Sequence, residues 1–516
     1  MSEATGRAGE VVERLLGLGV SEAVLAPGSR SGPLALALHA ADAQGLMRLH
    51  VRVDEREAGF LALGLAKASG RPVPVVTTSG TAVANLHPAM LEALHTRVPV
   101  IALTADRPGR LRGTGANQTT DQRAIFPGVD FTDDISELGP LDGPVQVNLE
   151  FDEPLVEAVE WRFDRRPFDP PRTGGASTRG ATTCEGSKRG VVVAGDGAGP
   201  RARALADALG WPLLAEPSSG VRDERALGAY RLLLAGPLGD QIEQVVSLGH
   251  ATLSRPVTGL LTRPDLDVVH LGDASTFPGV PGPNVVLTDD VIPNGQADPA
   301  WRETWRAVDE AARAAIDDLK TDALRLAETV WSAAAGGALV MGSSSAARDL
   351  DLVRPGPAPD VVVANRGLAG IDGLLSTAVG VALGAGRPTH ALVGDLTFCH
   401  GANGLLIGPR EPRPDLAVVV ASDDGGAIFS LLEQGDPAYA SAFERVYATP
   451  TGTQIAALCQ AHGVPHRRVA VDELADALAT APDGISVIEV PLDRTRRRAE
   501  SEAIAAAVAT SMEQRR

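Results

Sequence analysis

Two aspartates in the last third of the chain have the type and spacing needed to bind a divalent cation. Asp395 ends the apolar run THALVGD, and Asp423 follows the run DLAVVVAS, 28 positions further on. That spacing suits one strand–helix–strand crossover, and a right-handed crossover brings both strand ends to the same edge of a sheet. Because Mg²⁺ prefers oxygen ligands and keeps phosphate oxygens in its shell, the pair predicts a site for Mg²⁺ and a phosphorylated ligand.

Two glycines, Gly425 and Gly426, come shortly after the second aspartate. Without side chains they let the backbone approach a ligand closely, and they offer a carbonyl to a metal and N–H groups to phosphate. The alternative is that an aspartate at a strand end only caps a helix. That alternative is the better interpretation for one aspartate, but the pair with its glycines favours the metal site.

A third acidic residue, Glu55, stands between the strand-like run LHVRVD and the helical stretch that contains FLALGLAKASG. A carboxylate in the first turn of a helix interacts favourably with the helix macrodipole. Taken alone, this structural interpretation of Glu55 is the better one.

A glycine-rich segment at 191–200, VVVAGDGAGP, looks like a nucleotide-binding loop. It lacks the third glycine at the spacing of a dinucleotide fingerprint, and Pro200 interrupts it. We interpret the segment as a structural turn.

The elements that must position these residues are short apolar runs separated by longer amphipathic stretches. Continuous Val/Ile/Leu runs flanked by helices are typical of parallel strands buried on both faces. We therefore predict an α/β fold with three successive domains of mainly parallel sheet flanked by helices. The expected strands are 23–27, 49–54, 72–77, 98–106 and 145–149, then 190–195, 231–236, 266–273 and 284–289, then 338–343, 361–367, 389–395, 415–422 and 485–492.

The segment 165–189 is rich in Pro, Gly, Ser, Thr and Arg and has no apolar periodicity, so we predict a linker there. A weaker boundary lies near 315–335, where a helical stretch leads into the apolar run ALVMGS. The predicted domains are 1–164, 190–320 and 325–516.

The composition excludes several classes of function. The formal net charge of −18 argues against non-specific nucleic-acid binding, and it means that an anion site must be a local cluster of Arg. Three cysteines without a C-x-x-C pattern are typical of reduced thiols. The N-terminus has acidic residues where a signal peptide is basic, and no run reaches about 18 apolar residues. We expect a cytoplasmic protein without a membrane span.

The motifs taken together resemble those of the 2-succinyl-5-enolpyruvyl-6-hydroxy-3-cyclohexene-1-carboxylate synthases, a menaquinone-pathway family of thiamine-diphosphate enzymes. The resemblance covers nearly the whole chain and rests on the ordered set. In sequence order the motifs are Ala26-Pro27-Gly28-Ser29-Arg30-Ser31, Asp54-Glu55-Arg56, Thr78-Ser79-Gly80-Thr81-Ala82, Thr104-Ala105-Asp106-Arg107-Pro108, Gly115-Ala116-Asn117-Gln118, Asn365-Arg366-Gly367, Gly370-Ile371-Asp372-Gly373, Gly394-Asp395-Leu396 and Asp423-Asp424-Gly425-Gly426-Ala427-Ile428-Phe429.

The resemblance implies a pyrimidine-binding domain at 1–164, a central domain at 190–320 and a diphosphate-binding domain at 325–516. It implies a homodimer or homotetramer with active sites at the subunit interface. Glu55 matches the catalytic glutamate, which contacts the cofactor's aminopyrimidine ring, and Ile371 matches the residue that bends the cofactor. Asp395, Asp423 and the Gly425 carbonyl match the ligands of Mg²⁺, with Mn²⁺ as an alternative metal. The implied cofactor-binding set is Glu55, Gly370, Ile371, Gly394, Asp395, Leu396, Asp423, Gly425, Gly426, Ile428 and Phe429.

The implied enzyme is a transferase that decarboxylates 2-oxoglutarate and adds the resulting carbanion to isochorismate. Both substrates carry two carboxylates, which Arg binds well through its bidentate fork. The family's substrate-binding positions map onto Ser29, Arg30, Arg107, Asn117, Gln118, Ser344, Arg348 and Arg366, and Arg255 lies where the central domain supplies a basic residue. Any single Arg among them has the alternative of being a solvated or paired surface residue.

The sequence also departs from the family pattern. Leu396 fits this family, although the wider superfamily has Gly there, but Asp423 stands where relatives often have Asn. Ser422 and Gly401 replace polar or acidic residues expected in close relatives. Two alternatives stay open: another thiamine-diphosphate 2-oxo-acid decarboxylase or acetolactate-type synthase, and an oligomeric binding protein that has lost the chemistry.

Overall fold

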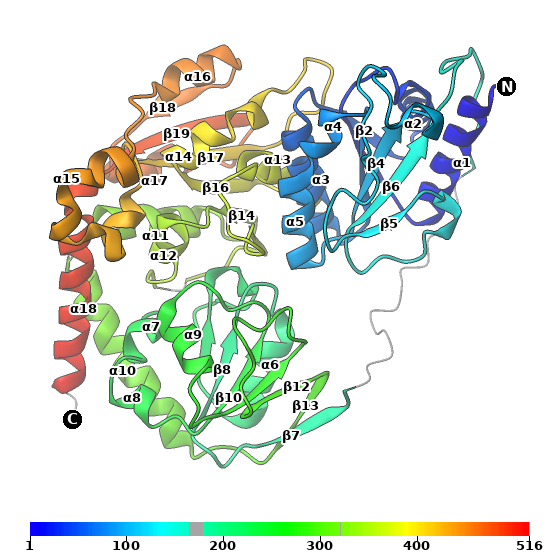
Figure 1. Cartoon of the computed structure of the whole chain (residues 1–516). Helices are drawn as coiled ribbons and strands as arrows, with labels where there is room; N and C mark the ends of the chain where they lie inside the picture. Colours follow the sequence, from blue (N-terminus) through cyan, green and yellow to red (C-terminus); the bar gives the residue numbers. More distant parts are fainter. Residues whose placement is uncertain (165–178, 320, 355, 515–516) are drawn as a thin grey trace.

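The computed structural model describes residues 1–164, 179–319, 321–354 and 356–514. Figure 1 shows three sheet-containing units in sequence order, coloured blue to cyan, green, and yellow to red. Every strand pairing within these sheets, for the residues described, is parallel. The predicted α/β class with mainly parallel sheets is confirmed.

The first unit has a six-stranded sheet in the order β2-β1-β3-β4-β6-β5. Its strands are β1 (Glu22–Leu25), β2 (Arg48–Val51), β3 (Val73–Thr77), β4 (Val100–Asp106), β5 (Asp130–Thr132) and β6 (Val145–Glu150), and its helices are α1 (Glu3–Gly17), α2 (Gly32–Ala43), α3 (Glu55–Ser69), α4 (Thr81–Ala84) and α5 (His87–Thr96). Strands β3 and β4 are buried along their whole length, as their continuous apolar runs predict.

The central unit has a five-stranded sheet in the order β12-β11-β10-β8-β9 and a separate pair, β13-β7. The strands are β7 (Ala181–Glu185), β8 (Gly190–Ala194), β9 (Leu213–Ala215), β10 (Gln244–Leu248), β11 (Asp267–Leu271), β12 (Val285–Thr288) and β13 (Asp290–Asn294). The helices are α6 (Pro200–Leu209), α7 (Tyr230–Leu233), α8 (Pro237–Asp240), α9 (Arg255–Leu261) and α10 (Pro299–Leu319).

The third unit has a six-stranded sheet in the order β15-β14-β16-β17-β19-β18. Its strands are β14 (Ala338–Met341), β15 (Val361–Ala364), β16 (Thr389–Gly394), β17 (Leu416–Ser422), β18 (His466–Arg468) and β19 (Ile485–Pro491), and its helices are α11 (Asp322–Ala333), α12 (Ser345–Leu350), α13 (Leu374–Ala385), α14 (Asp395–His400), α15 (Ala440–Phe443), α16 (Ile455–Ala461), α17 (Leu474–Ala477) and α18 (Arg497–Glu513). The last helix, α18, leaves this sheet and packs beside α10, so Ile504 and Val508 belong to the core of the central unit (Figure 1).

One predicted strand is wrong. The run at 231–236 belongs to helix α7 and the turn after it, and the sheet position is filled by β10, which the sequence analysis missed. A short apolar run fits a buried helix as well as a strand. Here tertiary contacts decide, because β10 pairs with both β8 and β11, whereas Tyr230 in α7 donates a hydrogen bond to Asp351 Oδ1 at 2.6 Å.

The predicted linker also contains regular structure. Residues 165–178 lie outside the described part of the chain, but 181–185 form β7, which pairs with β13 across more than a hundred residues. The pattern at 181–185 is too short and too polar to indicate a strand, and its partner supplies the hydrogen bonds. The glycine-rich run 191–200 forms β8 and a turn into α6, as predicted.

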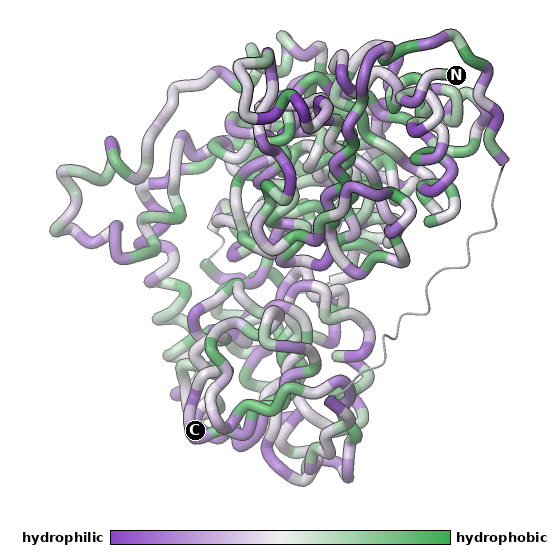
Figure 2. The backbone as a smooth tube through the Cα atoms, turned by 45° about the vertical axis from the view of Figure 1, so that its right-hand side comes forward, coloured by the Kyte–Doolittle hydropathy of each residue, from purple (hydrophilic) through white to green (hydrophobic). Residues whose placement is uncertain are grey.

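The first and third units pack closely through α3 and α13, and one apolar core continues through both. A Cβ on Gly64 of α3 would lie 2.2 Å from the Thr377 carbonyl oxygen, and one on Gly380 of α13 would lie 2.5 Å from the Leu61 carbonyl oxygen. Figure 1 shows these two units side by side, and in both views, Figures 1 and 2, the central unit lies below them. In the described residues no helix is both long enough and apolar enough to cross a membrane.

Gly64→Ala should therefore destabilise the chain, because the added methyl group overlaps the backbone of α13. We expect a loss of about 1–3 kcal/mol, measured as a lower apparent melting temperature. Gly259→Ala is the matched control: Gly259 lies in helix α9 with open space around its Cβ position. The control should raise stability by roughly 0.8–1 kcal/mol through helix propensity. Equal effects of both substitutions would contradict this account of the α3–α13 contact.

Candidate active site

Asp395 and Asp423 line one pocket of about 150 Å³ at the carboxyl edge of the third sheet. Asp395 follows β16 and Asp423 follows β17, and these strands are neighbours with Gly394 opposite Ala421. The pocket brings together nine of the eleven predicted cofactor-binding residues, and the predicted substrate residue Ser344 also lines it. The nine are Ile371, Gly394, Asp395, Leu396, Asp423, Gly425, Gly426, Ile428 and Phe429.

The electrostatics of the pocket favour a bound cation. Burial raises the pKa of Asp395, although its oxygens accept backbone hydrogen bonds from Leu396 at 2.7 Å and Gly425 at 2.9 Å. Burial, and then the charge of Asp395, raises the pKa of Asp423 to about 7. Two carboxylates that destabilise each other's charge gain from a divalent cation between them. The part of the chain that the structure describes has no cluster of three His, Cys, Asp or Glu side chains able to hold a metal, so other ligands must complete the shell.

The backbone around Gly425 leaves no room for a side chain at this position. Gly425 has φ +143°, and a Cβ there would lie 2.4 Å from the Ala448 carbonyl oxygen. The next amide, Gly426 N, donates to that same carbonyl at 2.7 Å. The loop therefore brings bare backbone to the pocket, which suits a diphosphate and its metal.

Two charged residues that line the pocket were missed by the sequence analysis. Arg497, at the start of α18, donates two hydrogen bonds to the carboxylate of Asp349, at 2.7 and 2.9 Å. Both residues line the pocket, and the positive charge of Arg497 opposes the rise in the pKa of Asp423. The only sequence signal was the basic run RTRRRAE, which also fits a solvated helix start.

Glu55 lies outside this pocket. It is the first residue of α3, and its Oε2 accepts a hydrogen bond from Asn85 Nδ2 at 3.1 Å. Its neighbours contact the third unit, since Arg56 donates to the His400 carbonyl at 2.8 Å and Asn403 donates to Asp54 at 2.9 Å. Gly370 likewise lies elsewhere, in a separate pocket between α5 and the segment 365–372.

Four of the five predicted substrate arginines interact electrostatically as two like-charged pairs. The pKa of Arg107 is lowered by desolvation and then by Arg30, and the pKa of Arg348 is lowered by desolvation and then by Arg366. Arg30 and Arg107 donate to the carbonyls of Phe151 and Gln118, at 2.8 and 2.6 Å, while Arg348 donates to the Ser344 carbonyl at 3.1 Å. Guanidinium groups that are close together and bound to neutral acceptors form a good site for anionic ligands.

Of the other predicted substrate residues, Ser29, Asn117 and Gln118 belong to the segments around Arg30 and Arg107, whereas Arg255 lies apart from them. Ser29 and Asn117 are exposed, and Gln118, with φ +53°, donates from Nε2 to the Ser79 carbonyl at 2.8 Å. Arg255 is not brought to the site: its guanidinium binds the carboxylate of Glu433 at 2.5 and 3.0 Å, and its side chain is 75% exposed.

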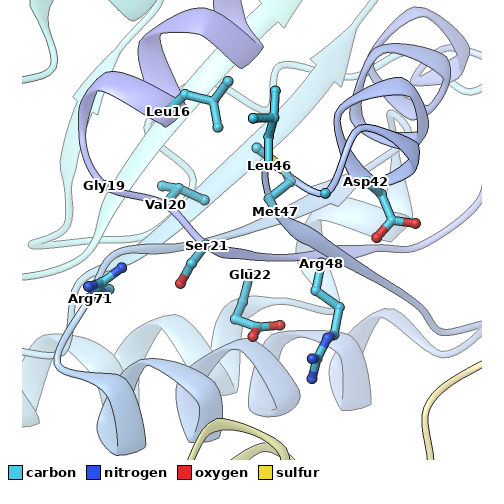
Figure 3. Close-up of a pocket in the computed structure, with 11 residues that line it drawn as sticks. Leu16, Gly19, Val20, Ser21, Glu22, Asp42, Leu46, Met47, Arg48 and Arg71 are labelled. Atoms are coloured by element: carbon cyan, nitrogen blue, oxygen red, sulfur yellow. The ribbon is translucent and has the colours of Figure 1, made fainter. Parts of the chain in front are cut away.

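A further pocket, shown in Figure 3, lies at the opposite edge of the first sheet. Its walls include Glu22 and Arg48, which begin β1 and β2. Ligands of parallel α/β sheets bind beyond the carboxyl ends of the strands. The aspartate pocket, at the carboxyl edge of its sheet, is therefore the better candidate for a ligand site.

Comparison with known proteins gives the family. Residues 7–125 match the family model described as thiamine pyrophosphate enzyme, N-terminal TPP-binding domain. A 2-succinyl-5-enolpyruvyl-6-hydroxy-3-cyclohexene-1-carboxylate synthase from Nocardioides sp. is 49% identical, over 98% of this chain and 98% of its own. The chain belongs to this synthase family. Synthases of the same name from Kineococcus radiotolerans and Saccharopolyspora erythraea are 45% and 42% identical, each over 98% of this chain and 99% of the relative.

The fold of this synthase is shared with a distant solved structure. A crystal structure of benzoylformate decarboxylase from Polynucleobacter necessarius has a TM-score of 0.64 at 18% identity, and the match covers 94% of this chain and 98% of that one. At that identity the match shows the fold alone. The family model and this structural match together show that the chain has the fold of the thiamine-diphosphate enzymes.

Proposed function

We propose that this chain decarboxylates 2-oxoglutarate and adds the remaining four-carbon unit to isochorismate, with thiamine diphosphate and Mg²⁺ (or Mn²⁺) as cofactors, in the menaquinone pathway. The supporting observation is the combination of a carboxylate pocket with two pairs of arginines. The pocket suits a metal-bound diphosphate, and the arginines suit two dicarboxylate substrates. We propose that the three units are the pyrimidine-binding, central and diphosphate-binding domains, and that the protein is cytoplasmic.

The residues present fit the cofactor. Asp395, Asp423 and the Gly425 carbonyl would hold the metal, and the backbone of Gly425 and Gly426, which carries no side chains, would leave room for the diphosphate. Thiamine diphosphate supplies the electron sink that decarboxylation of a 2-oxo acid requires. The chain's own part is to bind the carboxylates of the substrates through Arg30, Arg107, Arg348 and Arg366, and to place the Glu55 carboxylate at the cofactor's ring.

The last of these roles requires a second copy of the chain. Glu55 does not line the pocket of Asp395 and Asp423 within one chain, although both belong to one cofactor site in the family. We propose that the first unit of one copy completes the pocket in the third unit of another, in a homodimer or homotetramer.

The test is an assay with purified protein, thiamine diphosphate, Mg²⁺, 2-oxoglutarate and isochorismate. Isochorismate loss is followed by absorbance, and the product is identified by mass spectrometry. We expect an adduct that requires all four components. If 2-oxoglutarate is consumed while isochorismate is untouched, the protein is a plain 2-oxo-acid decarboxylase, and if neither substrate reacts, it is a binding protein.

A further inference from the structure

The short segment that carries Arg366 is held from outside its own domain. Glu92, in helix α5 of the first unit, accepts hydrogen bonds from two consecutive amides, Gly367 N at 2.9 Å and Leu368 N at 2.8 Å. Both carboxylate oxygens are used, and Glu92 is 3% exposed. A buried carboxylate that accepts two backbone N–H groups fixes that backbone strongly.

A second side chain of the first unit holds the other end of the segment. Lys67, in α3, donates from Nζ to the Ala364 carbonyl at 2.7 Å and to Asn365 Oδ1 at 3.3 Å, and it forms an ion pair with Glu92 at 3.4 Å. The residues on both sides of Arg366 are thus tied to one buried Lys–Glu pair.

The packing around the segment leaves it little freedom to shift. A Cβ on Gly367 would lie 2.9 Å from the Cβ of His95 and 3.0 Å from the Glu92 carbonyl oxygen. The Asn365 carbonyl accepts from Ser343 Oγ at 2.8 Å, and Asn365 Nδ2 donates to Thr377 Oγ1 at 3.1 Å. The segment is therefore fixed to α5 on one side and to α13 and the loop after β14 of its own unit on the other.

The guanidinium group of Arg366 is itself bound only by a neutral acceptor, in the residues that the structure describes. Its Nη2 donates to Thr252 Oγ1 of the central unit at 2.8 Å, while Nε has no hydrogen-bond partner. The direction of the group is set by its backbone and by Thr252. In the described residues no carboxylate lies within ion-pair distance of it, although its charge opposes the rise in the pKa of the buried Asp196 and Glu216 of the central unit. A substrate carboxylate beside Arg348 would form the direct ion pair that Arg366 lacks.

We propose that Glu92 and Lys67 are positioning residues for substrate binding: by fixing residues 364–368 they aim Arg366 at a substrate carboxylate. The inference rests on the proposed function, in which Arg366 binds a dicarboxylate. It extends that function by making substrate recognition in the third unit depend on two side chains of the first unit of the same chain.

The test compares Glu92→Gln, Arg366→Ala and the double variant, with Glu303→Gln on the exposed face of α10 as the matched control. The KM values for 2-oxoglutarate and isochorismate are measured separately, together with kcat, the thiamine diphosphate affinity and the melting temperature. Glutamine keeps the length of the side chain but loses its charge and one acceptor oxygen. We expect Glu92→Gln to raise the KM of the same substrate as Arg366→Ala, by about tenfold, with kcat and cofactor affinity nearly unchanged.

The double variant shows whether the change in KM caused by Glu92→Gln depends on Arg366. If Glu92 acts through Arg366, the KM of the double variant equals that of Arg366→Ala alone, because residues coupled through a shared backbone segment are not additive. Additive effects, or a lower melting temperature with unchanged KM values, would overturn the positioning role. Lys67→Met should reproduce the KM change and decides the question if Glu92→Gln does not fold. Unchanged KM values in Arg366→Ala would instead refute the substrate role of Arg366 in the proposed function.

Discussion

A Glu55→Gln variant is expected to lose roughly 10²–10⁴-fold in kcat, the range typical of a group that assists proton transfer. A carboxylate is charged and only accepts hydrogen bonds, whereas the amide of glutamine is neutral and donates as well. The variant therefore keeps the shape of the site but does not stabilise a protonated ring nitrogen of the cofactor. The measurements are steady-state turnover and the rate of hydrogen–deuterium exchange at C2 of bound thiamine diphosphate.

The fold should be unaffected by this change. Glu55 is the first residue of α3, and the cap of that helix is made by Asp54, whose carboxylate accepts from the amides of Arg56 and Glu57. The melting temperature should stay close to that of the unaltered protein. The control is again Glu303→Gln, which changes the net charge by the same amount and should leave turnover unaltered. Turnover and exchange at the original rates in Glu55→Gln would refute its catalytic role.

Replacing Asp395 with asparagine is expected to weaken Mg²⁺-dependent binding of thiamine diphosphate by more than about 100-fold, since even residues that only orient a metal ligand are worth roughly 10–100-fold in affinity. The carboxylate is 8% exposed, so water does not easily replace it. The measurement is calorimetric titration of the cofactor at a series of Mg²⁺ concentrations. It reports binding directly and does not depend on turnover.

The neighbouring acid Asp424 provides the control for this prediction. Its side chain is 59% exposed, and its φ of +52° lies in the left-handed region that asparagine tolerates well. Asp424→Asn therefore removes one charge from the same loop without removing a proposed ligand, and the cofactor affinity should change little. Equal losses in both variants would show a general effect of charge, and no loss in Asp395→Asn would exclude it as a metal ligand.

The sequence alone was sufficient for features that depend on local pattern. Continuous apolar runs placed β16 and β17 correctly, and the rule that parallel strands end at one edge brought Asp395 and Asp423 into one predicted site. The start of α3 at Glu55 follows from the switch between a strand-like and a helical pattern. Each of these depends on residues within one element, or on two elements joined by a single crossover.

The pattern of apolar residues alone did not predict the structure of short or polar runs. The run at 231–236 is apolar enough for a strand but forms α7, while β10, with Gln244 and Ser247 in its sequence, is a central strand. Both outcomes are set by which segment has hydrogen-bonding partners on its two sides. Those partners lie in β8 and β11, one before and one after β10 in the sequence, and only the folded sheet shows that β10 lies between them.

By itself, then, the sequence determined the α/β class, the edge of the sheet where the aspartate pocket lies and most of the residues that line this pocket. Only the tertiary structure decided which charges meet. It paired Arg497 with Asp349, fixed the Arg366 segment to Glu92 and Lys67, bound Arg255 to Glu433 and carried α18 into the core of the central unit. The physical reason is that periodicity records how each element buries its own apolar face, whereas contacts between distant polar side chains arise only when separately formed units pack together.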